Sequence, residues 1–358
     1  MTSHPSRIRP ILLDLPEGEA TAHNQALQDG AIRTIIRFAA HSGVEFRSAI
    51  LLRILGAIPG FPRLSIKDLL AASAAAGLPL VGGHAELREL EGGGPFLAYL
   101  RRADEAAAGL DLVHVHEVRS RSVVTADDRF GTERMPRGVF EERWSGLVLR
   151  LADPSVTAPG TGNAELEAYR RSVEVLPGML SPSECAELIE YCEDACFRRS
   201  RVMQKRDGKD AGGDVVQTRV RSSSSVVLQD RGHPLLARLY EAVARHEGVS
   251  ERDIEHIQCV RYKRAQRFRS HFDGGVDLPR LATYLLYLND DFDGGETYFP
   301  MLDLSIAPKS GSCLRFASCT ADGRVLWQSE HGGLPVTRGV KYALNIWVRC
   351  PIRLAAAA

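Results

Sequence analysis

The two halves of the chain carry different hydrophobic patterns. In the first half, apolar residues recur every three or four positions in 29–41 (DGAIRTIIRFAAH), which predicts a helix. A second predicted helix, IKDLLAASAAAG, begins after the capping residue Ser65 and stops at Gly77. Three strand-like segments follow, PFLAYLRR, DLVHVHEVRS and SVVTADD, and FEERWSGLVLRL closes the unit. Helices followed by a sheet predict an α+β unit.

The second half reads as many short strands with two helices. VEVLPGML predicts a strand, and a helix follows in which Ser181 is the N-cap, Pro182 the first helical residue and Glu184 the closing residue of a capping box. A further helix is predicted from Pro234 to Glu247. The remaining predicted strands are IQCVRY, RSHFD, ATYLLYL, SCLRFAS and YALNIWV. This order predicts an antiparallel barrel or jelly roll braced by the two helices.

A segment rich in Pro, Gly, Ser and Thr, 153–163 (DPSVTAPGTGN), separates the two patterns. We therefore expect one domain over 1–155, a linker over 156–165 and a second domain over 166–354. The polar stretch 204–213 predicts a loop of the kind that closes over a substrate. A chain of 358 residues is long enough to bury two separate cores.

Charge and composition exclude several classes of partner. Lys+Arg and Asp+Glu number 45 each, so the chain has no net basic field to attract nucleic acid or anionic lipid. No segment approaches the ~20 apolar residues of a membrane span. The first residues, MTSHPSRIRP, lack the apolar region of a secretory signal, which favours a cytoplasmic protein. The oligomeric state is left open by the sequence.

The seven cysteines all lie at Cys185 or later. Cys185, Cys192 and Cys196 are spaced as one face of a helix, and we expect them to be small buried apolar side chains. The sequence contains no C-x-x-C motif of the kind that would indicate a zinc site.

The candidate chemistry lies in the second half, in the tripeptide His271-Phe272-Asp273. At the end of a strand, alternation places His271 and Asp273 on the same side. An isolated H-x-D is more often a core histidine beside a turn aspartate. Here a glycine pair follows it and a further histidine, His331, is available from a distant strand. Two imidazoles and one carboxylate suit Fe(II) held on one face.

A lysine stands ten residues after His331, at the start of the apolar run Lys341-Tyr-Ala-Leu. A lysine in such a run normally requires an anionic partner. The distal carboxylate of 2-oxoglutarate would be a suitable partner.

With these motifs, residues 173–353 resemble the prolyl 4-hydroxylase branch of the Fe(II)/2-oxoglutarate dioxygenases. The resemblance implies a double-stranded β-helix (jelly roll) with flanking helices. It implies that His271, Asp273 and His331 form the catalytic metal site and that Lys341 pairs with 2-oxoglutarate. The implied cofactors are Fe(II), 2-oxoglutarate as co-substrate and dioxygen, with ascorbate as a further candidate.

Four more residues receive roles from the same resemblance. Tyr262, nine residues before His271, and Thr297, in GGETYFP, would contact 2-oxoglutarate. Arg280 and Trp347 would face a peptide substrate. For each residue a plain structural alternative stands beside the role: strand packing for Tyr262, a turn for Thr297, a solvated side chain for Arg280 and core filling for Trp347.

Residues 25–151 resemble the papain-like leader peptidases that cleave after double-glycine motifs, in QDGAIRTIIRFAAHSG and FEERWSGLVLRL among other stretches. The resemblance implies a papain-like fold. The cysteine of that family is expected near Asp29-Gly30, yet no cysteine precedes residue 185, and Asp111 stands where its histidine is expected. Without a thiolate the catalytic dyad cannot form. The resemblance therefore implies a degenerate peptidase-like domain that binds peptides.

His114 and His116 alternate onto one face of their predicted strand. Half-buried strand histidines are the simpler interpretation, and a second metal site is the alternative.

Three functions follow from these observations. The first is a hydroxylase of a prolyl or another residue in a peptide or protein, with the first domain recruiting the substrate, for example through a leader peptide. Hydroxylation of a free amino acid or small metabolite is the variant of this hypothesis. The second, a cysteine peptidase, conflicts with the missing cysteine. The third is a peptide-binding or sensing protein with an inert oxygenase fold. Such a protein would not need an intact triad and lysine, so their presence argues against this hypothesis.

Overall fold

The computed structural model describes residues 17–44, 46–59, 61, 64–101, 110–127, 131–152, 164–200, 202–204, 214–216, 221–274 and 279–350. The linker segment 153–163 and residues 205–213 of the predicted loop 204–213 lie outside these residues, whereas Gln204 belongs to a strand. The chain forms two compact units, an N-terminal unit made mainly of residues up to Arg170 and a C-terminal unit made mainly of residues from Arg171 onward; the short segment Pro300–Leu302 groups with the N-terminal unit. Most of helix α6 (Ala164–Ser172) groups with the N-terminal unit, where the Ser48 hydroxyl donates to Glu165 at 3.0 Å.

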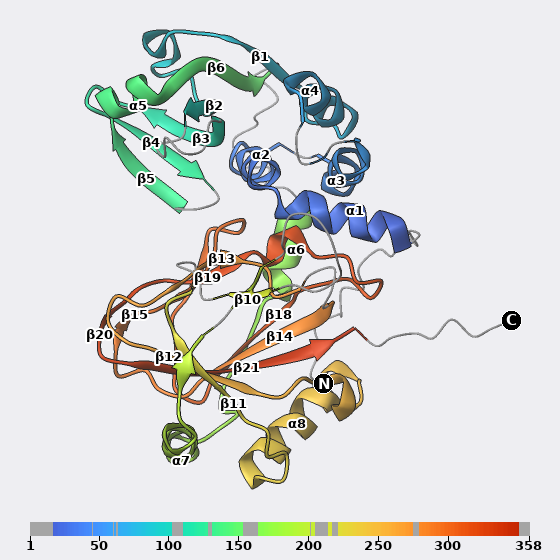
Figure 1. Ribbon diagram of the computed structural model, residues 1–358, viewed down its shortest axis with the longest axis vertical. Helices are drawn as coiled ribbons and strands as arrows, with labels where there is room; N and C mark the ends of the chain where they lie inside the picture. Colours follow the sequence, from blue (N-terminus) through green and yellow to red (C-terminus); the bar gives the residue numbers. More distant parts are fainter. Residues whose placement is uncertain are drawn as a thin grey trace, which may run out of the picture. The chain divides into compact units, whose positions relative to one another are not determined.

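The N-terminal unit is built on a six-stranded antiparallel sheet with the order β1-β6-β2-β3-β4-β5 (Figure 1). Its strands are β1 (Leu80–His84), β2 (Phe96–Arg101), β3 (Leu110–Val118), β4 (Ser122–Asp127), β5 (Gly131–Pro136) and β6 (Trp144–Leu151). Its other helices are α1 (Glu17–Gln28), α2 (Gly30–His41), α3 (Ser48–Ala57), α4 (Ile66–Ala75), α5 (Arg137–Arg143) and the 3-10 helix η1 (Leu87–Leu90). The predicted α+β architecture is confirmed.

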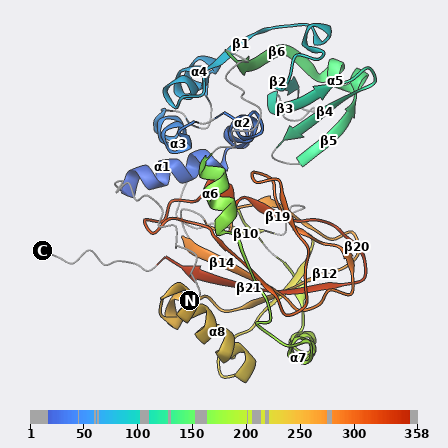
Figure 2. The same cartoon turned by 180° about the vertical axis from the view of Figure 1, so that it is seen from behind.

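Helix α2 begins where the sequence predicts, because the Asp29 carboxylate caps it by accepting from the backbone N–H groups of Ala31 and Ile32. Its apolar face is fully buried and consists of Ile32, Ile35, Ile36, Phe38 and Ala39. This face packs against β2, β3 and β4, and α2 lies beside the sheet in both views of the ribbon (Figure 2).

The C-terminal unit contains two principal antiparallel sheets. The larger has the order β7-β18-β14-β21-β12-β11-β8, and the smaller has the order β13-β19-β16-β17. The bounds are β7 (Glu174–Leu176), β8 (Arg198–Arg199), β9 (Val202–Gln204), β10 (Asp214–Val216), β11 (Ser224–Val227), β12 (Gln258–Tyr262), β13 (Phe268–His271), β14 (Arg280–Tyr287), β15 (Asp293–Gly294), β16 (Thr297–Phe299), β17 (Leu304–Ile306), β18 (Cys313–Ala317), β19 (His331–Gly333), β20 (Val336–Arg338) and β21 (Lys341–Arg349). The helices are α7 (Pro182–Asp194), α8 (Pro234–Glu247), η3 (Glu251–Asp253) and η4 (Trp327–Ser329). The unit has the predicted double-stranded β-helix fold.

Strand alternation gives the larger sheet two different faces. On β21, Tyr342, Leu344 and Ile346 point to the layer of α7 and α8, where they join a buried apolar cluster. Lys341, Ala343 and Asn345 alternate with them and line a pocket on the opposite face. Strands β12 and β14 divide their residues in the same way. The sheet is thus buried on one face by helices and hollowed on the other.

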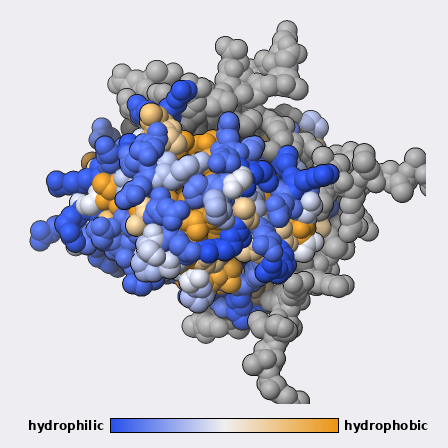
Figure 3. All heavy atoms as spheres, turned by 90° about the horizontal axis from the view of Figure 1, so that it is seen from below, coloured by the Kyte–Doolittle hydropathy of each residue, from blue (hydrophilic) through white to orange (hydrophobic). Residues whose placement is uncertain are grey.

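Helices α7 and α8 turn their apolar residues toward the sheet, among them Leu188, Leu236 and Tyr240. The surface seen from below in Figure 3 is correspondingly mainly hydrophilic, with apolar patches between the polar side chains. Cys185 and Cys192 are buried as predicted. The same prediction is wrong for Cys196, which is exposed because α7 ends at Asp194 and the chain turns there with a φ of 58°.

Among the described residues, no helix has the length and apolar composition that crossing a bilayer requires.

Candidate active site

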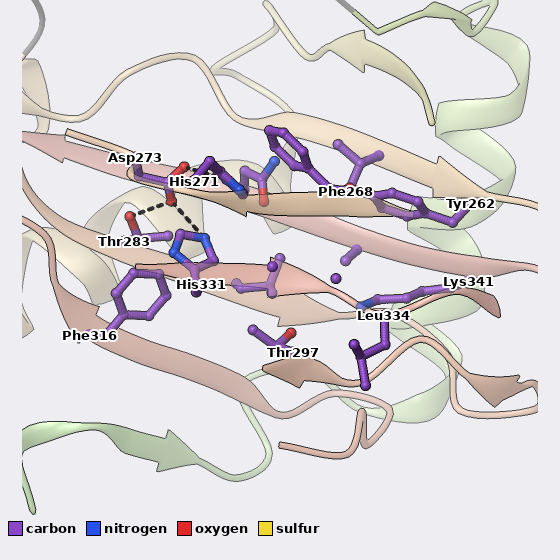
Figure 4. A pocket seen from close by; sticks show the side chains of 16 residues that line it. Tyr262, Phe268, His271, Asp273, Thr283, Thr297, Phe316, His331, Leu334 and Lys341 are labelled. Carbon is purple, nitrogen blue, oxygen red and sulfur yellow. Dashed lines mark hydrogen bonds and ion pairs between the residues drawn. The ribbon is translucent and has the colours of Figure 1, made fainter. Parts of the chain in front are cut away.

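The structure brings His271, Asp273 and His331 together at one end of the pocket (Figure 4). His271 on β13 and His331 on β19 are direct partners in the antiparallel register. The Asp273 carboxylate lies between the two rings, with Oδ1 3.4 Å from His271 Nε2 and Oδ2 3.5 Å from His331 Nε2. One ligand atom from each of the three residues lies within 4.8 Å of the others. This is the arrangement that the sequence predicts.

Backbone carbonyls fix the orientation of both imidazoles. The Nδ1 of His271 lies 2.9 Å from the Arg269 carbonyl oxygen, and the Nδ1 of His331 lies 2.9 Å from that of Ser329. A ring that donates from Nδ1 to a carbonyl presents the lone pair of Nε2, which is the form that binds a metal. Burial and the neighbouring His271 lower the pKa of His331 to about 4, so its ring is neutral at physiological pH.

Asp273 is held ionised and in place by its neighbours. Burial alone would raise its pKa, but His331, His271 and Arg280 outweigh that effect and hold the pKa well below its usual range. The Thr283 hydroxyl on β14 donates to Asp273 Oδ2 at 2.8 Å and also contacts the Ser318 hydroxyl at 2.9 Å. The carboxylate therefore has a fixed orientation toward the two imidazoles.

The ring of Phe268 stacks on the face of the His271 imidazole. The ring of Phe268 lies parallel to the imidazole, with centroids 3.6 Å apart and planes 18° apart. The guanidinium of Arg221 lies 4.8 Å from the centroid of Phe268, and it donates to the Ser223 hydroxyl at 2.9 Å and to Gln258 at 3.1 Å. The stack restricts rotation of the His271 ring.

The other end of the pocket carries one positive charge. Lys341 is the only Lys or Arg among the 16 residues described as lining the pocket. It is the register partner of Tyr262, and its Nζ donates to the Gly295 carbonyl at 2.7 Å. Burial lowers the pKa of Lys341 to about 8, with Glu296 acting in the opposite direction. The ammonium group is thus mainly protonated at neutral pH and partly dehydrated.

The rings of Tyr262 and Tyr287 lie near this lysine, and Thr297 is hydrogen-bonded to Tyr287. Thr297 lines the pocket, and its Oγ1 is 2.8 Å from the Tyr287 hydroxyl. Lys341 Nζ is 5.1 Å from the centroid of the Tyr287 ring and 5.8 Å from that of Tyr262. Figure 4 shows Lys341 and Tyr262 at the side of the pocket opposite His331 and Asp273.

Arg280 and Trp347, the two predicted substrate residues, are not among the described residues that line the pocket. Arg280 donates to both carboxylate oxygens of Glu255 at 2.8 Å and to the Asp273 carbonyl at 3.1 Å. Its guanidinium also lies 3.7 Å from the centroid of the Trp347 ring. Arg280 is therefore a fixed, paired group, and a role for either residue toward a substrate stays a prediction.

Sequence reasoning missed several residues of the site, namely Phe268, Thr283, Tyr287 and Asn345. The available signal was a polar residue at an alternate, inward-facing position of an otherwise apolar strand. Thr283 is a polar residue at an inward position of the apolar strand β14. Asn345 is a polar residue on β21 that faces the same side of the sheet as Lys341.

Comparison with known proteins matches residues 257–349, nearly all of them in the C-terminal unit, to the 2OG-Fe(II) oxygenase superfamily. The chain is similar to "Prolyl 4-hydroxylase 1" of Arabidopsis thaliana, with 31% identity over 219 residues, which cover 55% of this chain and 75% of the relative. It is 28% identical over 188 residues to "Putative prolyl 4-hydroxylase" of Acanthamoeba polyphaga mimivirus, covering 49% and 73% of the two chains. This chain belongs to the 2OG-Fe(II) oxygenases of the prolyl 4-hydroxylase type.

Among solved structures, the oxygenase is similar to the viral collagen prolyl hydroxylase of Paramecium Bursaria Chlorella virus-1 in its 2OG complex. The two share 26% sequence identity with a TM-score of 0.41, over 50% of this chain and 96% of the other. None of these comparisons identifies the N-terminal unit as a peptidase-like domain.

The site of the oxygenase fits the cofactors of its superfamily. Two imidazoles, of which the His331 ring is neutral, and one ionised carboxylate converge from one side, which is the donor set and facial arrangement that Fe(II) takes in 2-oxoglutarate-dependent enzymes. When bound, Fe(II) with 2-oxoglutarate supplies the oxidising chemistry with dioxygen.

We expect Thr283→Val to weaken metal binding without removing a ligand. The valine keeps the volume but cannot donate to Asp273 Oδ2, and loss of such an outer partner typically costs ~10–100-fold in metal affinity. Titration of the metal-free enzyme with Co(II) measures the change. Thr297→Val, in the same pocket but away from the triad, is the matched control and should leave Co(II) affinity unchanged. Equal affinities for the wild type and Thr283→Val would contradict the role of Thr283.

Proposed function

We propose that the enzyme hydroxylates a prolyl residue within a peptide or protein. The observation that carries this proposal is the pocket itself, with a triad for Fe(II) at one end and one buried lysine at the other. The similarity to relatives named prolyl 4-hydroxylases supports proline as the residue.

In this proposal 2-oxoglutarate lies along the pocket. Lys341 pairs with its distal carboxylate, and Tyr262 and Thr297 contact the same end of the molecule. Apolar side chains between the two ends, among them Val260 and Leu285, keep water away from the bound co-substrate. The chain thus supplies orientation and a fixed charge.

We propose that Trp347 contacts the peptide and that Arg280 supports it. The Trp347 Nε1 is buried and has no hydrogen-bond partner among the described residues, so it is a donor that a substrate carbonyl could use. Because Glu255 neutralises Arg280, that side chain serves as a rigid support for the indole rather than as a free charge.

The proposed function is tested by anaerobic loading with Fe(II) and 2-oxoglutarate, followed by air and a panel of peptides with and without proline. Mass spectrometry should find one added oxygen atom on prolyl residues, and His331→Ala should abolish it. Free proline and small metabolites belong in the same panel. Oxygen addition to those molecules alone, with every peptide unchanged, would contradict the proposal.

Removing the buried ammonium should weaken co-substrate binding strongly. Losing one partner of a buried charge pair costs ~2–5 kcal/mol, so Lys341→Ala should raise the KM for 2-oxoglutarate by roughly 30-fold or more. Lys263→Ala, at an exposed lysine, is the control and should leave the KM unchanged. An unchanged KM in Lys341→Ala would assign the distal carboxylate to another group.

The same lysine predicts a pH dependence. Its pKa is lowered to about 8, and only the protonated form pairs with a carboxylate, so the dissociation constant for 2-oxoglutarate should be lowest below pH 8 and rise above it. Lys341→Arg keeps its charge through this range and should bind with little pH dependence. Parallel pH profiles for the two proteins would contradict the assignment.

We further propose that the N-terminal unit is a degenerate papain-like domain that recruits the peptide. Its support is the order of helices and sheet, together with the start of α2, where Asp29 caps the helix at the position expected for a nucleophilic cysteine. A carboxylate there stabilises the helix end but cannot attack a peptide bond in the manner of a thiolate.

This recruitment predicts an unequal effect of removing the unit. A tethered peptide has a raised effective concentration at the site, so a chain shortened to residues 171–358 should lose hydroxylation of a long peptide far more than uncoupled 2-oxoglutarate decarboxylation. In the full chain, a leader-like peptide without proline should compete with the long substrate but not with a short one. Equal losses in both activities, with no competition, would show that the unit has only a structural role.

A further inference from the structure

Three histidines of the N-terminal unit gather between helix α2 and strand β3. The ring centroids of His114 and His116 are 4.0 Å apart, and those of His41 lie 5.2 Å from His116 and 5.6 Å from His114. His114 is fully buried, His116 is half-buried and His41 is exposed. The cluster therefore leads from the core to the surface.

The local structure explains why the rings meet. Alternation on β3 turns His114 and His116 to the face on which α2 packs. His41 occupies the last turn of α2, and Phe38, three residues earlier, packs edge-on against His114 with centroids 5.3 Å apart. The sequence alone links only the two strand histidines, and α2 adds the third.

The ring nitrogens of the strand histidines lack the partners that a packed core normally provides. Both nitrogens of His114 and the Nε2 of His116 are buried without a hydrogen-bond partner among the described residues. Such groups are costly, because they have lost water and gained nothing in return. An aliphatic residue would fill the same position on β3 without that cost.

The third histidine, His41, has its Nδ1 next to a backbone carbonyl, as the histidines of the active site do. The Nδ1 of His41 lies 2.9 Å from the Arg37 carbonyl oxygen of its own helix. A proton on Nδ1 gives Nε2 the lone pair, as in His271 and His331.

Electrostatics favour the uncharged form of the two strand histidines. Burial, with His116, His41 and Arg37 nearby, lowers the pKa of His114 to about 2, and burial with His41 and Arg37 also lowers that of His116. Neutral imidazole is the form that coordinates metals. The Arg37 guanidinium opposes a bare cation, so a bound metal would also carry an anionic ligand such as hydroxide or chloride at its open position.

We propose that His41, His114 and His116 form a second metal site, which takes a divalent transition metal of the zinc type. Donor sets made only of imidazole suit Zn(II) and its neighbours and disfavour Mg(II) and Ca(II). Rings that share one such ion have centroids roughly 5 Å apart, from metal–nitrogen bonds of ~2.0–2.1 Å. The two centroid distances from His41 fit this spacing, whereas the 4.0 Å between His114 and His116 is shorter. Among the described residues, only the active-site triad already has three ligand atoms within 4.8 Å of one another, so the histidine rings have to turn toward a common point on binding.

The test uses Zn(II) and the full chain with His271→Ala and His331→Ala, which removes the triad as a competing site. This background protein should bind one Zn(II), and binding should raise its thermal unfolding midpoint. Adding His41→Ala or His116→Ala should weaken the affinity by more than roughly 100-fold and abolish the thermal shift, because a ligand matters more than its outer partner. His84→Ala, at an exposed histidine of β1, is the matched control and should change neither measurement.

His41 and His116 are chosen because they are less buried than His114, so their alanine variants should fold. Absence of stoichiometric Zn(II) binding in the background protein would overturn the proposal. Binding that survives both His41→Ala and His116→Ala would overturn it equally, since the metal would then lie elsewhere.

Discussion

The pairing of His271 with His331 across two antiparallel strands is the constraint on which the active site depends. The register fixes the distance between the two imidazoles, and the bend that follows β13 brings Asp273 onto the same side two residues after His271. A slip of one residue in this pairing would turn the side chains of one strand to the opposite face. The triad is therefore specified by backbone hydrogen bonding as much as by the identity of its residues, and the carbonyls of Arg269 and Ser329 complete it by selecting the ring nitrogen that faces the metal.

Strand β21 of the larger sheet has to be apolar on one face and polar on the other. On β21 the residues that face α7 and α8 are apolar and close-packed, whereas the alternate residues must supply an ammonium group and an amide to a hollow. Burying the ammonium of Lys341 is unfavourable, as its lowered pKa shows, and the Gly295 carbonyl offsets only part of that cost. An anionic co-substrate satisfies the remainder. The protein thus keeps a partly unsatisfied charge where ligand binding has to be strong.

Much of the C-terminal unit could be predicted from the sequence because its signals are local. Hydrophobic patterning located the longer strands of the unit, whereas the short strands, such as β16 and β19, were missed; a capping box located the start of α7. The triad and Lys341 were found because their types and spacing are distinctive. The prediction for Cys196 was wrong because helix periodicity was extended past the helix end, and α1, α3, β1 and β5 were missed because they lack strong alternation or caps. Thr283, Phe268 and Arg221 were missed for another reason: their roles exist only through contacts between strands, which no single segment reveals.

The N-terminal unit shows the same limit more clearly. Its strand pattern places His114 and His116 on one face, but only the packing of α2 on β3 adds His41, so local sequence predicts two parts of the cluster and never the whole. The two units also share one feature, because in each an imidazole is hydrogen-bonded through Nδ1 to a backbone carbonyl. In the C-terminal unit a carboxylate completes the set and favours Fe(II). In the N-terminal unit the cluster has no carboxylate ligand, and a donor set made only of imidazole disfavours hard cations and leaves imidazole-preferring metals as the ions that such a site can hold.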